Sequence, residues 1–169
     1  MRQEPEQEID ADAILALNRA HEAETSRLDA AGLAALLAEA FMVGLREGGR
    51  AAFLIALDER ARYDSPNFRW FRERYGRFVY VDRVVVAPDR RGEGLARALY
   101  EELFARAEAA GHVLVGCEVN LAPPNPGSLA FHAALGFAEL GQGRPAGRDK
   151  LVAYLGRSLG SGPASAQKG

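Results

Sequence analysis

Apolar and polar positions in the first third of the chain follow two periods, one typical of helices and one typical of strands. Residues 10–24 and 29–40 combine leucine and alanine with an aspartate at each start, and both segments predict helices. Residues 41–45 and 51–57 are strand-like apolar runs, separated by a Glu-Gly-Gly-Arg turn signal at 47–50. These runs therefore predict an antiparallel hairpin that follows two helices.

A long aromatic insertion, residues 58–77, separates this hairpin from the next predicted strand at 78–86. Ser65 and Pro66 supply a cap and a first helical position, so a short helix is expected there. Loops of this length in compact domains are often lids or binding loops. Aromatic side chains also dominate cores, so packing of the insertion against the sheet is the alternative. The aromatic residues concerned are Tyr63, Phe68, Trp70, Phe71 and Tyr75.

The segment from Val84 to Leu99 changes from a β-branched run to an Ala- and Leu-rich helix, with Gly92 and Gly94 between the two. Glycines let the backbone turn tightly, and the N–H groups at a helix start lack partners at the positive end of the helix dipole. This order of strand, loop and helix start predicts a site for phosphate. The P-loop pattern is excluded because no lysine follows Gly94, and the dinucleotide pattern is excluded because Arg97 holds the position of its third glycine.

Two sequence motifs add detail to the prediction of a phosphate site. The loop reads Arg91-x-x-Gly94-x-Ala96, and after a strand-like run at 112–119 residues 125–137 read Asn-Pro-Gly-Ser-Leu-Ala-Phe-His-Ala-Ala-Leu-Gly-Phe. The first resembles the Gln/Arg-x-x-Gly-x-Gly/Ala loop of the GNAT superfamily of N-acetyltransferases, which holds the pyrophosphate of coenzyme A. The second resembles the family's Asn-x-x-Ser/Ala-x-x-Phe/Leu-Tyr-x-x-x-Gly-Phe signature. The order strand, loop, long helix, strand, short helix and one final strand is similar to the family over nearly half of the chain.

That resemblance implies an α/β (α+β) fold with a mixed, twisted central sheet flanked by helices. The sheet would be antiparallel in its first half, with splayed parallel strands at the coenzyme site. We expect a single domain over residues 1–159. The tail at 160–169 is rich in Gly, Ser, Ala and Pro and is predicted to be disordered.

Composition and charge exclude several other classes. The formal net charge is −2 and only Lys150 and Lys168 are lysines, so no basic stripe predicts binding to nucleic acid. No apolar run approaches the roughly 20 residues that cross a bilayer. The first residues lack the apolar core of a signal peptide, so we expect a cytoplasmic protein without a membrane partner. Cys117 is the one cysteine, which excludes an intrachain disulfide and a cysteine zinc cluster, and no metal is expected.

The resemblance assigns the coenzyme contacts to the strand and the loop. Backbone groups of Val84, Val85 and Val86 would hold the pantetheine and the thioester oxygen. The pyrophosphate would lie in the loop, with the carboxylate of Glu93 turned outward because it repels phosphate. Asn125 either caps the short helix or contacts the coenzyme directly. The loop residues concerned are Arg91, Gly92, Glu93, Gly94, Leu95, Ala96 and Arg97, with Arg90 as an added positive charge.

Three residues are candidates for acid–base chemistry. Glu118 lies at a strand position that resembles that of a catalytic glutamate in some ribosomal-protein acetyltransferases. Asp82 shares a strand face with Val84 and Val86, where partial desolvation suits a second acid–base or ammonium-binding group. The alternatives are structural ion pairs, for Asp82 with a distant arginine, and a water chain that replaces both carboxylates. His132 occupies the position of a tyrosine that protonates the coenzyme thiolate in many relatives. Imidazole can donate that proton, and a core histidine without chemistry is the alternative.

These features predict an acetyl-CoA-dependent N-acyltransferase that transfers an acetyl group to a primary amine of a small molecule or peptide by direct attack on the thioester. A non-catalytic acyl-CoA-binding module is the alternative, because His132 replaces the tyrosine. A nucleotide-binding dehydrogenase is disfavoured because the third glycine is missing. His21 and Glu22 are further candidates for the acceptor site, and a homodimer is consistent with the resemblance.

Overall fold

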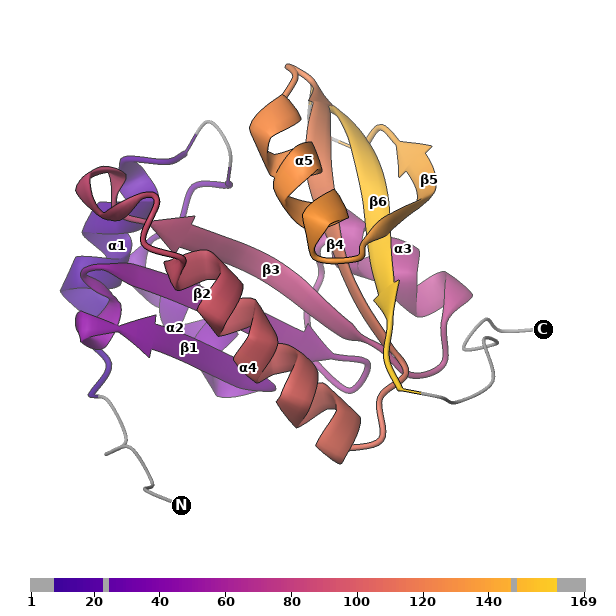
Figure 1. Cartoon of the computed structure of the whole chain (residues 1–169), viewed down its shortest axis with the longest axis horizontal. Coiled ribbons are helices and arrows are strands. Elements are labelled where there is room, and N and C mark those ends of the chain that lie inside the picture. The colour runs from indigo at the N-terminus through magenta and orange to yellow at the C-terminus, as the bar shows by residue number, and fades with distance from the viewer. Residues whose placement is uncertain (1–7, 23–24, 147–148, 161–169) are drawn as a thin grey trace.

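The computed structural model describes residues 8–22, 25–146 and 149–160, and Figure 1 shows how its helices and strands are arranged. The strands are β1 (Met42–Arg46), β2 (Ala52–Asp58), β3 (Val79–Val86), β4 (Leu114–Ala122), β5 (Ala138–Gly143) and β6 (Leu151–Ser158). The helices are α1 (Ala11–Arg19), α2 (Ala30–Glu39), α3 (Pro66–Arg74), α4 (Leu95–Ala109) and α5 (Pro126–Ala134).

The strands form one mixed sheet in the order β1-β2-β3-β4-β6-β5 within the described residues. Neighbouring strands are antiparallel except β3 and β4, which are parallel. The parallel pairing covers only Val79 with Val115 and Tyr80 with Gly116, and beyond these pairs the two strands diverge (Figure 1). A mixed sheet with splayed parallel strands confirms the predicted fold class.

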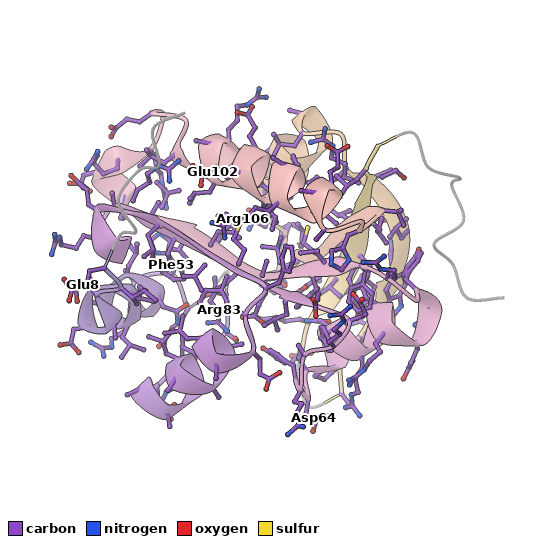
Figure 2. The ribbon with its side chains drawn as sticks, turned by 90° about the horizontal axis from the view of Figure 1, so that it is seen from below. Glu8, Phe53, Asp64, Arg83, Glu102 and Arg106 are labelled. Atoms are coloured by element: carbon purple, nitrogen blue, oxygen red, sulfur yellow. The ribbon has the colours of Figure 1, made fainter. Side chains whose placement is uncertain are left out.

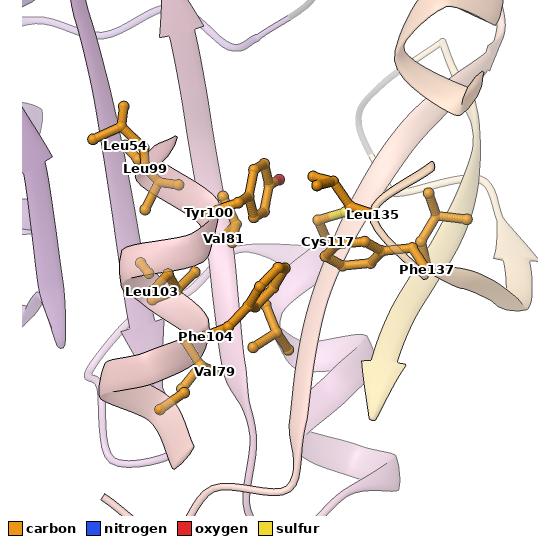
Figure 3. Close-up of a cluster of buried hydrophobic side chains, with 14 of the residues drawn as sticks. Leu54, Val79, Val81, Leu99, Tyr100, Leu103, Phe104, Cys117, Leu135 and Phe137 are labelled. Atoms are coloured by element: carbon orange, nitrogen blue, oxygen red, sulfur yellow. The ribbon is translucent and has the colours of Figure 1, made fainter. Parts of the chain in front are cut away.

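Helices cover both faces of the sheet, and a separate apolar cluster fills each side. Seen along the sheet, α4 lies on one face and α1 and α2 lie on the other (Figure 2). Leu99, Leu103 and Phe104 of α4 pack with Phe137 and the sheet in the first cluster (Figure 3). The second cluster contains apolar residues of α1, α2 and α3, among them Ile14.

The aromatic insertion contains the short helix that the sequence predicts, α3. Pro66 is its first residue, but the side chain of Ser65 makes no capping hydrogen bond. Phe68 and Phe71 are fully buried, and the indole of Trp70 stacks on the β6 ring of Tyr154 with 4.2 Å between the ring centroids. The insertion therefore packs against the sheet through its aromatic residues, as the alternative interpretation expected.

Two predicted boundaries are wrong. The first helix ends at Arg19 instead of continuing to residue 24, because the side-chain amide of Asn18 donates to the Ser26 carbonyl across a turn. The one strand expected after Phe137 is two antiparallel strands, β5 and β6. The β5 sequence is exposed and contains two glycines, so it lacks the apolar alternation that would have predicted a strand.

Two other expectations concern the C-terminal tail and the lack of a membrane-spanning helix. The predicted tail lies outside the described residues, apart from Gly160. Among the described residues, no helix combines the length and apolar character needed to span a bilayer.

Truncation of a side chain in the first cluster should lower the free energy of unfolding strongly. Leu103 is fully buried, so we expect Leu103→Ala to lower the free energy of unfolding by about 2–5 kcal/mol, because the deletion leaves a cavity. Leu140→Ala is the matched control, since this leucine is 38% exposed and its truncation should cost about 0.5 kcal/mol. Urea denaturation followed by circular dichroism measures both, and equal losses would contradict the assignment of the core.

Candidate active site

A cavity of about 750 Å³ lies where β3 and β4 diverge. The start of α4, helix α5 and the segments before β3 complete its wall. It brings together the three candidate acid–base residues Asp82, Glu118 and His132 with the predicted coenzyme residues. Three residues named from the sequence do not line the cavity, namely Glu22, Arg90 and Glu93. The predicted coenzyme residues in the wall are Val84, Val85, Val86, Arg91, Gly92, Gly94, Leu95, Ala96, Arg97 and Asn125.

The loop between β3 and α4 has the shape of an anion site. Gly92 and Gly94 adopt φ angles of +81° and +76°, a region in which side chains strain the backbone. Gly94 is the N-cap of the 15-residue helix α4, so the unpaired N–H groups of the first turn face the cavity end of the loop. The carboxylate of Glu93 accepts from Arg90 Nε at 2.7 Å, outside the cavity. Arg90 therefore balances Glu93, while Arg91 supplies its charge to the cavity wall.

His21 fixes the position of Arg91 from the other side of the loop. Nδ1 of His21 lies 2.9 Å from the Leu17 carbonyl, which only accepts, so Nδ1 carries the hydrogen. Nε2 can then accept from Arg91 Nη2 at 3.3 Å. The sequence suggests His21 for the acceptor site, whereas the structure places it against Arg91 in the loop between β3 and α4.

The Asp82 carboxylate is buried in a polar network. It accepts from Arg83 Nε at 2.7 Å and from the Tyr63 hydroxyl at 2.5 Å. Arg83 also donates to the Asn18 side chain and to the Ser26 carbonyl, which ties the segment after α1 to the sheet. Figure 2 shows Arg83 on the face of the sheet that α1 and α2 cover. Burial, together with the Asp82 charge, raises the pKa of Tyr63.

The expected ion pair of Asp82 with a distant arginine is wrong in one respect. Its partner is Arg83, the next residue in the chain. A β-bulge interrupts the strand alternation here, because Arg83 pairs with Ile55 and Val81 pairs with the next residue, Ala56, which leaves Asp82 as the extra residue of β3. The pair orients Asp82 and joins the cavity wall to α1.

Glu118 is held by two hydrogen bonds from other elements. Its carboxylate accepts from the Tyr80 hydroxyl on β3 at 2.6 Å and from Asn67 Nδ2 on α3 at 3.1 Å. Asn67 in turn accepts from the Tyr154 hydroxyl on β6 at 2.9 Å. Burial and the neighbouring Glu118 charge raise the pKa of Tyr80, so the phenol stays a donor. Asn67 and Tyr80 were missed from the sequence because no motif links them to Glu118.

His132 is part of a buried pair with Tyr100. Its Nδ1 lies 2.7 Å from the Ser128 carbonyl and must therefore carry the hydrogen. Nε2 then accepts from the Tyr100 hydroxyl at 2.7 Å. Burial lowers the pKa of His132 and raises that of Tyr100, so both groups are held neutral. Figure 3 shows the Tyr100 hydroxyl pointing toward the Cys117 strand and away from the axis of α4.

Tyr100 was missed from the sequence because its position in α4 follows the apolar pattern of a core residue. Tyr100 is fully buried and nevertheless lines the cavity. Asn125, at the start of α5, accepts from the Ser128 N–H at 3.3 Å, so it caps the helix and lines the cavity as well.

Comparison with known proteins identifies the family. The profile of the acetyltransferase (GNAT) family matches residues 21–137, more than half of the chain. The chain belongs to this family. Members of the family are acetyltransferases, so the protein is an acyltransferase. A search of curated proteins found no match.

Solved structures share the fold at low sequence identity. The ribosomal-protein-S18-alanine N-acetyltransferase from Escherichia coli superposes with a TM-score of 0.64 and 18% identity, covering 92% of both chains. A ribosomal-protein-alanine N-acetyltransferase from Brucella melitensis gives 0.62 and 22%, covering 89% of this chain and 94% of that one. A chain of the NatC complex bound to Gag peptide and CoA gives 0.65 and 15%, covering 93% of both chains.

The buried pair of Asp82 and Arg83 generates a stability prediction. The two side chains are 4% and 3% exposed, so Arg83→Met should lower the free energy of unfolding by about 3 kcal/mol or more, because a buried carboxylate loses its counter-ion. Adding Asp82→Asn should recover part of the loss. The exposed pair of Arg69 with Asp64 provides the control, and Arg69→Met should change stability by about 0.5 kcal/mol at most. Urea unfolding measures all variants, and a loss no greater than that of the control would contradict the role of Arg83.

Proposed function

We propose that the protein is an acetyl-CoA-dependent N-acetyltransferase that acts on a primary amine. One observation carries this proposal. A single cavity joins the phosphate-binding start of α4 to the carboxylates of Asp82 and Glu118, along the edge of β3 that β4 leaves unpaired. Membership in the acetyltransferase family supports it.

The coenzyme would follow β3 through this cavity. Its pyrophosphate would lie at the N-terminus of α4, where Arg91 and Arg97 supply positive charge and Gly94 leaves room for close approach. No strand pairs with the β4-facing edge of β3 after Tyr80 among the described residues. Backbone groups near Val84 are therefore available to the pantetheine.

The acceptor would be a cationic amine that enters beside the two carboxylates. Phenol and amide donors already orient these groups, so an amine meets a preorganised acidic wall. Two of the similar solved structures are ribosomal-protein-alanine N-acetyltransferases, and a third is a complex bound to a peptide. These similarities favour the amine of a peptide over that of a small molecule.

Acetyl transfer then needs one base for the amine and one hydrogen-bond donor for the leaving sulfur. Glu118 removes one proton from the ammonium group, the amine nitrogen forms a bond to the acetyl carbon, the carbon–sulfur bond breaks, and the further proton that the nitrogen loses protonates the departing thiolate. Neutral His132 directs no proton into the cavity, because its hydrogen is bonded to the Ser128 carbonyl. The Tyr100 hydroxyl therefore turns from His132 to stabilise the leaving sulfur, and His132 acts as a positioning residue.

The first test is isothermal titration with acetyl-CoA and CoA. The wild-type protein should bind both, and Gly94→Asp should abolish binding because it strains the backbone at φ +76° and sets a carboxylate against the pyrophosphate. Gly76→Asp is the matched control, since no atom lies within 4 Å of its added Cβ, and it should bind normally. Wild-type binding followed by acetylation of a peptide or small amine supports the enzyme. Binding without transfer across a broad amine panel would favour an acyl-CoA-binding module, and absence of binding would refute the proposal.

The second test separates the base from the donor to sulfur. Glu118→Gln should lower kcat by about 10²–10⁴-fold with every acetyl donor. Tyr100→Phe should lower kcat with acetyl-CoA while leaving its KM nearly unchanged, because the phenol acts on the departing sulfur. An acetyl thioester of a more acidic thiol should restore much of the Tyr100→Phe rate and none of the Glu118→Gln rate. Equal recovery in both variants, or full activity of Tyr100→Phe, would contradict these roles.

A further inference from the structure

Three metal-ligand side chains meet at the end of the sheet opposite the phosphate loop. Asp58 is the last residue of β2, Glu59 follows it, and His112 lies in the connection between α4 and β4. Their candidate ligand atoms all lie within 4.8 Å of one another. The cavity described above uses none of these residues.

The imidazole of His112 is buried, and its Nδ1 lacks a hydrogen-bond partner among the described residues. The side chain is 3% exposed. Buried polar atoms are normally satisfied, so this nitrogen requires an explanation.

Each carboxylate places one oxygen near a different nitrogen of this ring, and the unpartnered Nδ1 is the nitrogen that is available to an ion. Asp58 Oδ1 accepts from the Arg60 N–H at 2.9 Å, while Oδ2 lies 4.0 Å from His112 Nε2. Glu59 Oε1 lies 3.8 Å from Arg77 Nε, while Oε2 lies 3.5 Å from His112 Nδ1. The Phe78 N–H also points at Oε2, at 3.4 Å. Such outer contacts orient metal ligands, and Arg77 offsets part of the negative charge.

We propose that Asp58, Glu59 and His112 bind a divalent transition-metal ion of the zinc type. One imidazole and two carboxylates are ligands that zinc accepts, and water would complete its coordination. The carboxylate side chains are 20% and 16% exposed, which leaves an entry path for the ion. The expectation of no metal had considered only the lack of a cysteine cluster.

The ion would join parts of the sheet that are distant in sequence. Asp58 pairs with Val79 at the start of β3, and Val79 is one of two β3 residues that pair with β4. His112 lies two residues before β4. A bound ion would therefore link the end of β2 to the segment before β4, where β3 and β4 are still paired. Its role would be structural.

The test is zinc binding by the full chain after treatment with chelator and desalting. Isothermal titration with Zn²⁺ alone should show one equivalent bound, and thermal unfolding should shift to higher temperature. His112→Gln and Glu59→Gln should each weaken binding by about tenfold or more. His21→Gln removes a histidine elsewhere in the chain and should leave the zinc affinity unchanged.

Cobalt provides a second readout. Co²⁺ should give visible absorption bands with the wild-type protein that Glu59→Gln reduces, and this isosteric variant keeps the test valid if His112→Gln fails to fold. The proposal is overturned if the wild-type protein binds no Zn²⁺ at millimolar concentration. It is equally overturned if folded His112→Gln and Glu59→Gln bind Zn²⁺ as tightly as the wild type.

Discussion

β3 and β4 pair through two residue pairs and then separate, and the rest of the site depends on this parting. A sheet normally satisfies the backbone groups of its inner strands by pairing on both sides. Here β2 pairs with β3 from Val79 to Val86, whereas on the other side β4 pairs only with Val79 and Tyr80 among the described residues. The parting also opens the space between α4 and α5, where the phosphate loop and the acidic residues face one cavity.

An opening in the middle of a sheet places polar side chains in the core. Here these side chains are paired with one another by hydrogen bonds. Phenols of Tyr63 and Tyr80 donate to Asp82 and Glu118, and Tyr100 donates to His132. Each buried acceptor keeps a donor from another element, so the wall is polar and rigid at the same time. The aromatic insertion contributes through Asn67 on α3, which links Glu118 to β6. Specific packing and site geometry are therefore set by the same residues.

The two ends of β3 have different polar surroundings. At its end, glycines with positive φ leave the first turn of α4 open to an anion. At its start, Asp58, Glu59 and His112 surround the last paired residues before the strands diverge.

Local sequence determined the elements whose signals are short-range. The Asp29 cap, the hairpin at 47–50, the glycine loop and the Asn125 cap all act within a few residues, and each lies where the pattern predicts it. The alternation that predicted Asp82 on the face of Val84 is wrong, because a bulge at Asp82 interrupts it. Only the tertiary structure decided the partners of the candidate residues. Asp82 meets Arg83 at the bulge, Tyr100 meets His132 from another helix, and His112 meets Glu59 across the sheet. These contacts depend on strand register and helix packing between distant segments, which no local period encodes.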